Sequence, residues 1–140
     1  MRMSDCLKRR DPAGQTFAEF ALVGVVFLLL MFALMELATA VFDYTTICEA
    51  AREAVRYAIA HSPTSANPAT NTQIQQVAIN AAPSLGLAAT NVSVNWPADG
   101  NMPSKKDAQI TISYPYKLRL PLMSPITLTL AATSQSLVSQ

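Results

Sequence analysis

The sequence predicts an α+β fold with a long N-terminal helix, a short helix and a small three-stranded antiparallel sheet, all but the first part of the helix lying outside the cytoplasm. Two observations carry this prediction. Residues 20–35 contain no charged, hydroxyl or amide side chain, and about 20 mostly apolar residues are enough to span a bilayer. Three later runs alternate apolar and polar residues with a period of two, which is typical of strands with one buried face.

The apolar run predicts a transmembrane helix over residues 15–36. Glu19 and Glu36 mark its ends, so it can span if these carboxylates sit at the two interfaces. Basic residues remain on the cytoplasmic side of a membrane helix. The leader at residues 1–14 carries four of them before the run, and the next basic residue is Arg52. The N-terminus is therefore predicted to be cytoplasmic. The residues assigned to the membrane helix include Phe20, Leu22, Val26, Leu29, Phe32 and Met35.

The same helix is predicted to continue beyond the membrane over residues 37–61, because no proline occurs between Pro12 and Pro63. Apolar residues recur there at intervals of three and four, which indicates an amphipathic helix with one packing seam. The charged residues lie on other faces and form two pairs spaced i,i+3, which we interpret as a solvated surface. The seam includes Tyr44, Ile47, Ala51 and Val55, and the pairs are Glu49–Arg52 and Glu53–Arg56.

Residues 62–140 are predicted to form a small α+β domain. Ser62-Pro63 ends the long helix, and the sequence from Thr72 to Gln75 resembles a capping box that opens a short helix through Ala82. Alternation over residues 92–96, 109–114 and 126–130 predicts three strands. In the third strand Ile126, Leu128 and Leu130 are expected on the buried face. The segment after Pro97 is expected to turn, and Pro115, Pro121 and Pro125 to interrupt the link between the last two strands.

The composition gives no sign of enzymatic chemistry. His61 is the single histidine, there is no cluster with metal-ligand spacing and no phosphate-binding glycine loop. We therefore predict no catalytic residue, no metal and no cofactor. The net charge of +1 gives no reason to expect nucleic acid as a partner. Cys6 and Cys48 fall on opposite sides of the membrane in this topology, so they cannot pair within one chain, and Cys48 is interpreted as a small buried hydrophobe.

The junction between the leader and the apolar run has the character of a processing site. Gly14 is followed by Gln15, and Glu19 is the fifth residue counted from Gln15. A glycine allows a protease to approach the backbone closely, and Pro12 is expected to discourage helix upstream, so that the site is extended and the helix begins near Gln15. Glu19 either caps the helix dipole in the headgroup region or balances the charge of a newly freed ammonium on Gln15. The surrounding pattern favours the second interpretation.

These residues resemble the TadE-like family of the tight-adherence (Flp, type IVc) pilus systems, and more broadly the type IV pilins and pseudopilins. The resemblance rests on Gly14-Gln-Thr-Phe-Ala-Glu19, on Leu34-Met-Glu36-Leu and on Ala50-Ala-Arg52-Glu53-Ala-Val-Arg56-Tyr57-Ala. It covers about residues 8–60. Two features depart from the family pattern: Asp11-Pro12-Ala13 stands where arginine often precedes the glycine, and Ala54 replaces a glycine.

The resemblance implies a structural subunit made as a prepilin and cut after Gly14 by a prepilin peptidase on the cytoplasmic side. It implies a single-pass location in the bacterial inner membrane, or within the pilus, with the N-terminus cytoplasmic and the rest extracytoplasmic. The expected partners are other pilins or pseudopilins, the pilus assembly machinery of the inner membrane, and membrane lipid. The expected roles are pilus biogenesis and surface adhesion.

Two other interpretations stay open on sequence alone. Ala38-Thr39-Ala40 fits the cleavage site of an ordinary signal peptide, which would release a secreted protein. An uncleaved anchor would instead present a binding domain at the cell surface. The N-terminal residue of the protein from cells separates the three, since it would be Gln15, Val41 or Met1 respectively.

Overall fold

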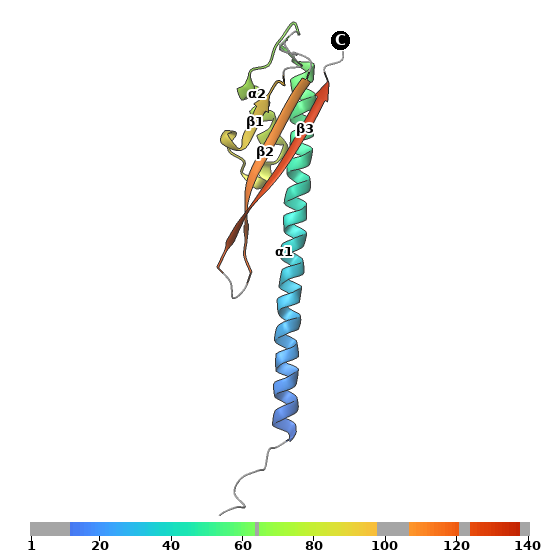
Figure 1. The fold of residues 1–140 in the computed structure, drawn as a ribbon, viewed down its shortest axis with the longest axis vertical. Helices are drawn as coiled ribbons and strands as arrows, with labels where there is room; N and C mark the ends of the chain where they lie inside the picture. The colour runs from blue at the N-terminus through green and yellow to red at the C-terminus, as the bar shows by residue number, and fades with distance from the viewer. Residues whose placement is uncertain (1–11, 64, 98–106, 121–123, 138–140) are drawn as a thin grey trace, which may run out of the picture.

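The computed structural model describes residues 12–63, 65–97, 107–120 and 124–137, and the side chains from Gly14 onward (Figure 1). Several sequence predictions fall outside the described residues. These are the leader before Pro12 with Cys6, the turn after Pro97, and Pro121. Within the described residues the chain has one long helix, one short helix and a three-stranded antiparallel sheet. The predicted α+β class is confirmed.

The long helix α1 spans Pro12–Ala60, 49 residues, or about 73 Å at 1.5 Å per residue. It begins three residues before the predicted start, so the expected extended segment around Gly14 is helical. Proline is accepted in the first turn of a helix, because its backbone angle suits the helix and its missing N–H would be unpaired there. The helix ends where predicted, and the His61 N–H donates to the Tyr57 carbonyl at 3.0 Å just before Pro63.

The short helix α2 spans Asn71–Ala81, and its capping box lies two residues earlier than predicted. Thr70 is the N-cap: its hydroxyl accepts from the Gln73 N–H, and the Gln73 side chain accepts from the Thr70 N–H. The predicted box at Thr72–Gln75 was wrong because threonine and glutamine recur with the same spacing in both registers. Two short 3₁₀ turns, Pro83–Leu85 and Ala89–Asn91, lead from α2 to the sheet.

The sheet has the order β1-β2-β3, with antiparallel pairing throughout. Its strands are β1 (Val92–Asn95), β2 (Asp107–Leu118) and β3 (Ile126–Leu137). Strand β2 continues through Pro115, which was predicted to lie in the link between the second and third strands. The pairing of β1 with β2 reaches only to Val92 opposite Ile112, so the rest of β2 has a free edge on that side. A proline is tolerated on such an edge because no sheet partner requires its N–H.

The hydrophobic core lies where the upper half of α1 meets α2 and the sheet (Figure 1). Ile47, Ala51 and Val55 from the predicted seam are almost fully buried in it, whereas Tyr44 is 45% exposed and lies at its margin. Small residues on the helix allow the sheet and α2 to approach its backbone closely. The fully buried members of the core are Ile47, Ala50, Ala54, Ala58, Ile74, Ala78, Ala82, Ala108, Ile110 and Ile112.

The first half of β3 was wrongly predicted to be buried. Leu128 stands opposite Tyr116 in the ladder, and directly paired residues share one face of the sheet. Tyr116 is only 7% exposed, yet Leu128 is 54% and Ile126 46% exposed. The reason is that a single helix covers only part of the width of two strands. Two long apolar side chains of β3 are therefore left uncovered near the end of the hairpin.

We expect Ile47→Asp to lower the free energy of unfolding by several kcal/mol, because it places an unpaired charge in a fully buried position. Tyr44→Asp is the matched control on the same helix, and its effect should be much smaller because Tyr44 is partly solvated. Trp96 is the single tryptophan and packs against the core. Its fluorescence during denaturant unfolding of the full chain in detergent reports the free energy of unfolding of each variant. Equal decreases in the free energy of unfolding for the two variants would contradict the observed core boundary.

Candidate functional site

The lower half of α1 is a membrane anchor by length and composition. It is apolar enough to cross a bilayer, and no part of its most apolar stretch is covered by the rest of the described chain. Five of the predicted membrane-helix residues are more than half exposed, and Leu29 is partly covered. An apolar surface of this size needs lipid or other helices around it. The five are Phe20, Leu22, Val26, Phe32 and Met35.

The predicted processing site lies in the first two turns of α1. The side-chain amide of Gln15 donates to a Glu19 carboxylate oxygen at 3.3 Å, and both side chains are exposed. A Cβ added at Gly14 would meet nothing within 4 Å, and Gly14 does not have a positive φ. The fold of the described residues therefore gives no reason for glycine at this position.

A second site, which the sequence analysis did not identify, lies at the outer end of the apolar run. One Glu36 carboxylate oxygen accepts hydrogen bonds from the Tyr116 hydroxyl at 3.0 Å and from the Arg119 backbone N–H at 2.9 Å. The partners are about 80 residues apart in sequence, so these bonds attach the β2–β3 hairpin to the helix. We call this arrangement the Glu36 clamp. Bonds to a charged acceptor are stronger than those between neutral groups.

Thr39 completes the clamp one helical turn above Glu36. Its hydroxyl donates to the Glu36 carbonyl at 2.8 Å, and the Tyr116 hydroxyl lies 3.0 Å from the Thr39 oxygen. The hydrogen bond between Thr39 and Tyr116 lowers the pKa of Tyr116. Burial, the hydrogen bond to Glu36 and the Glu36 charge outweigh it, so the pKa of Tyr116 is raised overall. The hydroxyl therefore remains a donor to the carboxylate at neutral pH.

Asp43 lies two turns above Glu36 on α1. Burial raises the pKa of its carboxyl group, and its negative charge contributes to the raised pKa of Tyr116. The clamp region of α1 therefore carries two partly covered carboxylates facing the hairpin. Only Glu36 has donors from the hairpin among the contacts of the described residues.

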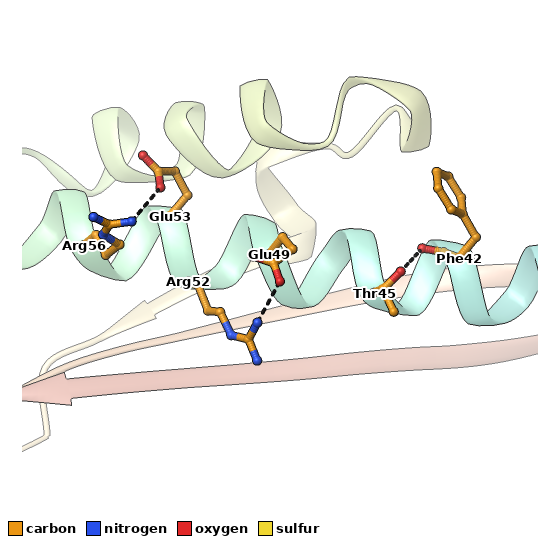
Figure 2. Close-up of polar contacts among 6 residues, drawn as sticks. All are labelled: Phe42, Thr45, Glu49, Arg52, Glu53 and Arg56. Carbon is orange, nitrogen blue, oxygen red and sulfur yellow. Dashed lines mark hydrogen bonds and ion pairs between the residues drawn. The ribbon is translucent and has the colours of Figure 1, made fainter.

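The charged face of α1 lies higher on the helix (Figure 2). Arg52 contacts Glu49 at 2.7 Å and Arg56 contacts Glu53 at 4.0 Å, with all four side chains at least 59% exposed. Exposed pairs of this kind stabilise a fold by less than about 1 kcal/mol. Cys48 is a free, half-buried thiol that packs against the core. It lines a pocket of about 130 Å³ between α1 and β3.

The polar contacts of the site are structural: they join segments of the chain to one another. Among the residues that the structure describes, no group of three or more His, Cys, Asp or Glu side chains gathers as metal ligands would. The polar contacts of the site join helix to hairpin and one helical turn to the next.

A long apolar N-terminal helix that continues into a small α+β head is the general architecture of pilin-like proteins. The comparison with protein families agrees: the family model described as TadE-like protein matches residues 14–56. The resemblance predicted from the sequence is thereby confirmed, and the chain is similar to a structural family of proteins associated with Tad pili. Neither the curated proteins nor the solved structures include a match to the chain.

We expect Tyr116→Phe to loosen the hairpin from the helix, because Glu36 then keeps a single donor from the hairpin. Leaving a charged acceptor short of a partner costs about 1–3 kcal/mol. Hydrogen exchange of the Arg119 amide should become faster by one to two orders of magnitude, an estimate obtained from that energy. Tyr114→Phe is the matched control, since the Tyr114 hydroxyl has no hydrogen-bond partner among the described residues. An unchanged Arg119 amide in Tyr116→Phe would rule out the clamp.

Proposed function

We propose that this chain is a TadE-type pseudopilin: a subunit made as a prepilin, matured by a prepilin peptidase, and required for assembly of a tight-adherence (Flp) pilus that mediates surface adhesion. The observation that carries the proposal is the extent of the family match. It begins at Gly14, the glycine predicted to be cut, and runs along α1 to Arg56. The membrane span, the helix side of the clamp (Glu36 and Thr39) and the charged face therefore lie within one matched segment, whereas Tyr116 and Arg119 lie outside it.

Cleavage after Gly14 is supported by the absence of any packing reason for glycine there. The peptidase needs an extended backbone, whereas the structure has Gly14 in the first turn of α1. The ends of helices open at little cost, and a Cβ added at Gly14 would meet nothing within 4 Å. In the proposed sequence of events the first turn unwinds, the bond between Gly14 and Gln15 is cut, and Gln15 becomes the N-terminus.

Glu19 then acquires a new partner. The Gln15 side chain already reaches its carboxylate, so the α-ammonium created on Gln15 lies one helical turn from a negative charge. In a bilayer, water and headgroups can satisfy each group separately. Within a bundle of helices water is scarce, so an unpaired carboxylate is penalised there more than at the membrane surface. Glu19 would thus favour docking where it meets an ammonium, on its own chain or on a neighbour.

The proposed topology follows from the charges and the apolar run. Residues 1–14 are a cytoplasmic leader, residues 15–36 span the inner membrane, residues 37–61 continue the helix outside, and residues 62–140 form the head together with it. The partners are the peptidase, other pilins or pseudopilins, the assembly machinery and lipid. Their helices would cover the apolar surface of α1 that the described chain leaves exposed.

A signal peptide cut after Ala40 fits the structure less well. Glu36 and Thr39 would be removed with the peptide, and the Tyr116 hydroxyl would lose both side-chain partners on α1. An uncleaved anchor bearing a binding domain preserves the clamp, so it is separated from the prepilin only by the N-terminal residue of the protein from cells.

We expect Gly14→Leu to block maturation, because the side chain obstructs close approach of the peptidase to the scissile carbonyl. Intact-mass measurement of membrane protein should give the chain beginning at Met1 for the variant and at Gln15 for the unchanged sequence. Gly24→Leu is the matched control, since Gly24 is also helical and free of contacts within 4 Å of an added Cβ. It should mature normally. A Gly14→Leu protein that still begins at Gln15 would refute processing at this bond.

We expect Glu19→Ala to leave membrane insertion intact and to impair assembly with other pilins. The reason is the loss of the carboxylate that pairs with the new N-terminus. The measurement follows leader removal, membrane association and surface pili together in one strain. Glu49→Ala is the control, because it removes an exposed glutamate from the same helix outside the span.

Normal pili in the Glu19→Ala strain would make Glu19 an interfacial helix-cap acid with no part in assembly. Loss of membrane association would show instead that the span does not begin at this residue. Both results are distinct from failure of the Gly14→Leu test, which concerns cleavage alone.

A further inference from the structure

We infer that the end of the β2–β3 hairpin is a second membrane contact, which rests on the outer leaflet beside the point where α1 leaves the bilayer. The surface concerned, called here the hairpin end, comprises residues 117–120 and 126–128. The inference rests on the proposed topology, in which residues 15–36 span the membrane. Its ligand is the lipid surface itself.

The depth of the hairpin end follows from the clamp. Glu19 and Glu36 are 17 residues apart on one helix, or about 25 Å, whereas the hydrocarbon core is about 30 Å thick. With Glu19 at the inner interface, Glu36 therefore reaches no farther than the outer boundary of the hydrocarbon, and any tilt of α1 lowers it. The Arg119 N–H lies 2.9 Å from the Glu36 carboxylate, so the hairpin end is held at the same depth.

Figure 1 shows the same relation in the whole molecule. The ends of β2 and β3 that are joined to each other point down alongside α1, away from α2 and from the core. In this view they reach the level of the middle of α1 and splay away from its axis.

The chemistry of the hairpin end fits a lipid interface. Ile126 and Leu128 are 46% and 54% exposed, and Leu118 and Leu120 are partly exposed beside them. Lys117 and Arg119 are exposed, and among the described residues neither side chain forms an ion pair. Apolar side chains at the acyl boundary with cations among lipid phosphates are the pattern of interfacial binding.

The unpaired backbone groups at the outer edge of β2 limit how deeply the hairpin end can insert into the bilayer. Beyond Ile112 the outer edge of β2 has no strand beside it, and unpaired edge N–H and C=O groups are costly in hydrocarbon. The hairpin end therefore lies at the boundary between the acyl core and the headgroup layer and inserts no deeper. Pro115 and Pro125 lie in this part of the hairpin, and proline has no N–H to desolvate.

Lipid fits this face better than a second copy of the chain. Ile126 and Leu128 lie on the face of the ladder opposite to Lys117. A lipid surface can surround the hairpin end and contact both faces, whereas a second copy packed on the apolar face contacts only one. Anionic headgroups complement Lys117 and Arg119. The hairpin end is also bonded to Glu36, at the end of the apolar part of α1 that is itself assigned to lipid.

The test uses the full chain with Cys6 and Cys48 replaced by Ala, one new cysteine, and a nitrobenzoxadiazole label. The protein is reconstituted in vesicles of phosphatidylcholine and phosphatidylglycerol, with or without spin-labelled phosphatidylcholine as quencher. The reporter is Leu128→Cys in the hairpin end. Gln135→Cys, exposed near the other end of β3, is the aqueous control, and Leu29→Cys is the control for the membrane span. Trp96 fluorescence checks that each variant is folded.

We expect a blue-shifted emission from the Leu128→Cys label and a loss on quenching several times that of the Gln135→Cys label. Adding Lys117→Gln and Arg119→Gln should reduce both effects in vesicles rich in phosphatidylglycerol. Quenching equal to that of Gln135→Cys would overturn the inference. A blue shift of the Leu128→Cys label that grows with protein density and is not accompanied by quenching from the spin-labelled lipid would also overturn the inference. That result would assign the face to a second copy of the chain. An unquenched Leu29→Cys label would instead overturn the proposed span, and with it the inference that rests on it.

Discussion

The structure depends on a single constraint: one uninterrupted helix must serve both as membrane span and as part of the core of the head. In the proposed topology lipid or other helices surround its lower half, which the rest of the described chain leaves exposed. The upper half supplies Ile47, Ala51, Val55 and several alanines to a core that α2 and the sheet cannot form alone. A small three-stranded sheet is marginal by itself. The head therefore has no independent fold without the helix, and its position relative to the membrane is set by the helix.

The Glu36 clamp lies at the point on α1 where the helix changes from membrane span to part of the head. A carboxylate at the end of an apolar run is costly unless donors reach it, and the hairpin supplies a hydroxyl and a backbone N–H. The two glutamates at the ends of the run thus have different partners. Glu36 is satisfied within the chain by the hairpin. Glu19 accepts a hydrogen bond from the nearby Gln15 side chain among the described residues, and we propose that it pairs with an ammonium created by processing. The Glu36 carboxylate orients the head, and the Glu19 carboxylate would direct assembly.

Much of the fold could be predicted from the sequence, because local periodicity identifies its helices and strands. Sixteen residues without a polar side chain mark the span, spacing by three and four marks the continuation of the helix, and period-two runs mark the strands. The clamp could not be predicted in the same way, since Tyr116 meets Glu36 only through a long-range register. The burial of Ile126 and Leu128 was also predicted wrongly. Alternation shows that a strand has two different faces, but it does not show whether a helix is wide enough to cover one of them.

A double-mutant cycle on Glu36→Gln and Tyr116→Phe tests the central claim, that the hairpin is held to the helix by this charge, most directly. Unfolding of the full chain in lipid nanodiscs would be measured for the unchanged protein, both single variants and the double variant. A hydrogen bond to a charged group predicts a coupling energy of about 1.5–3 kcal/mol. Two effects that add to within about 0.5 kcal/mol would show that the carboxylate and the hydroxyl do not act together, and would contradict the account.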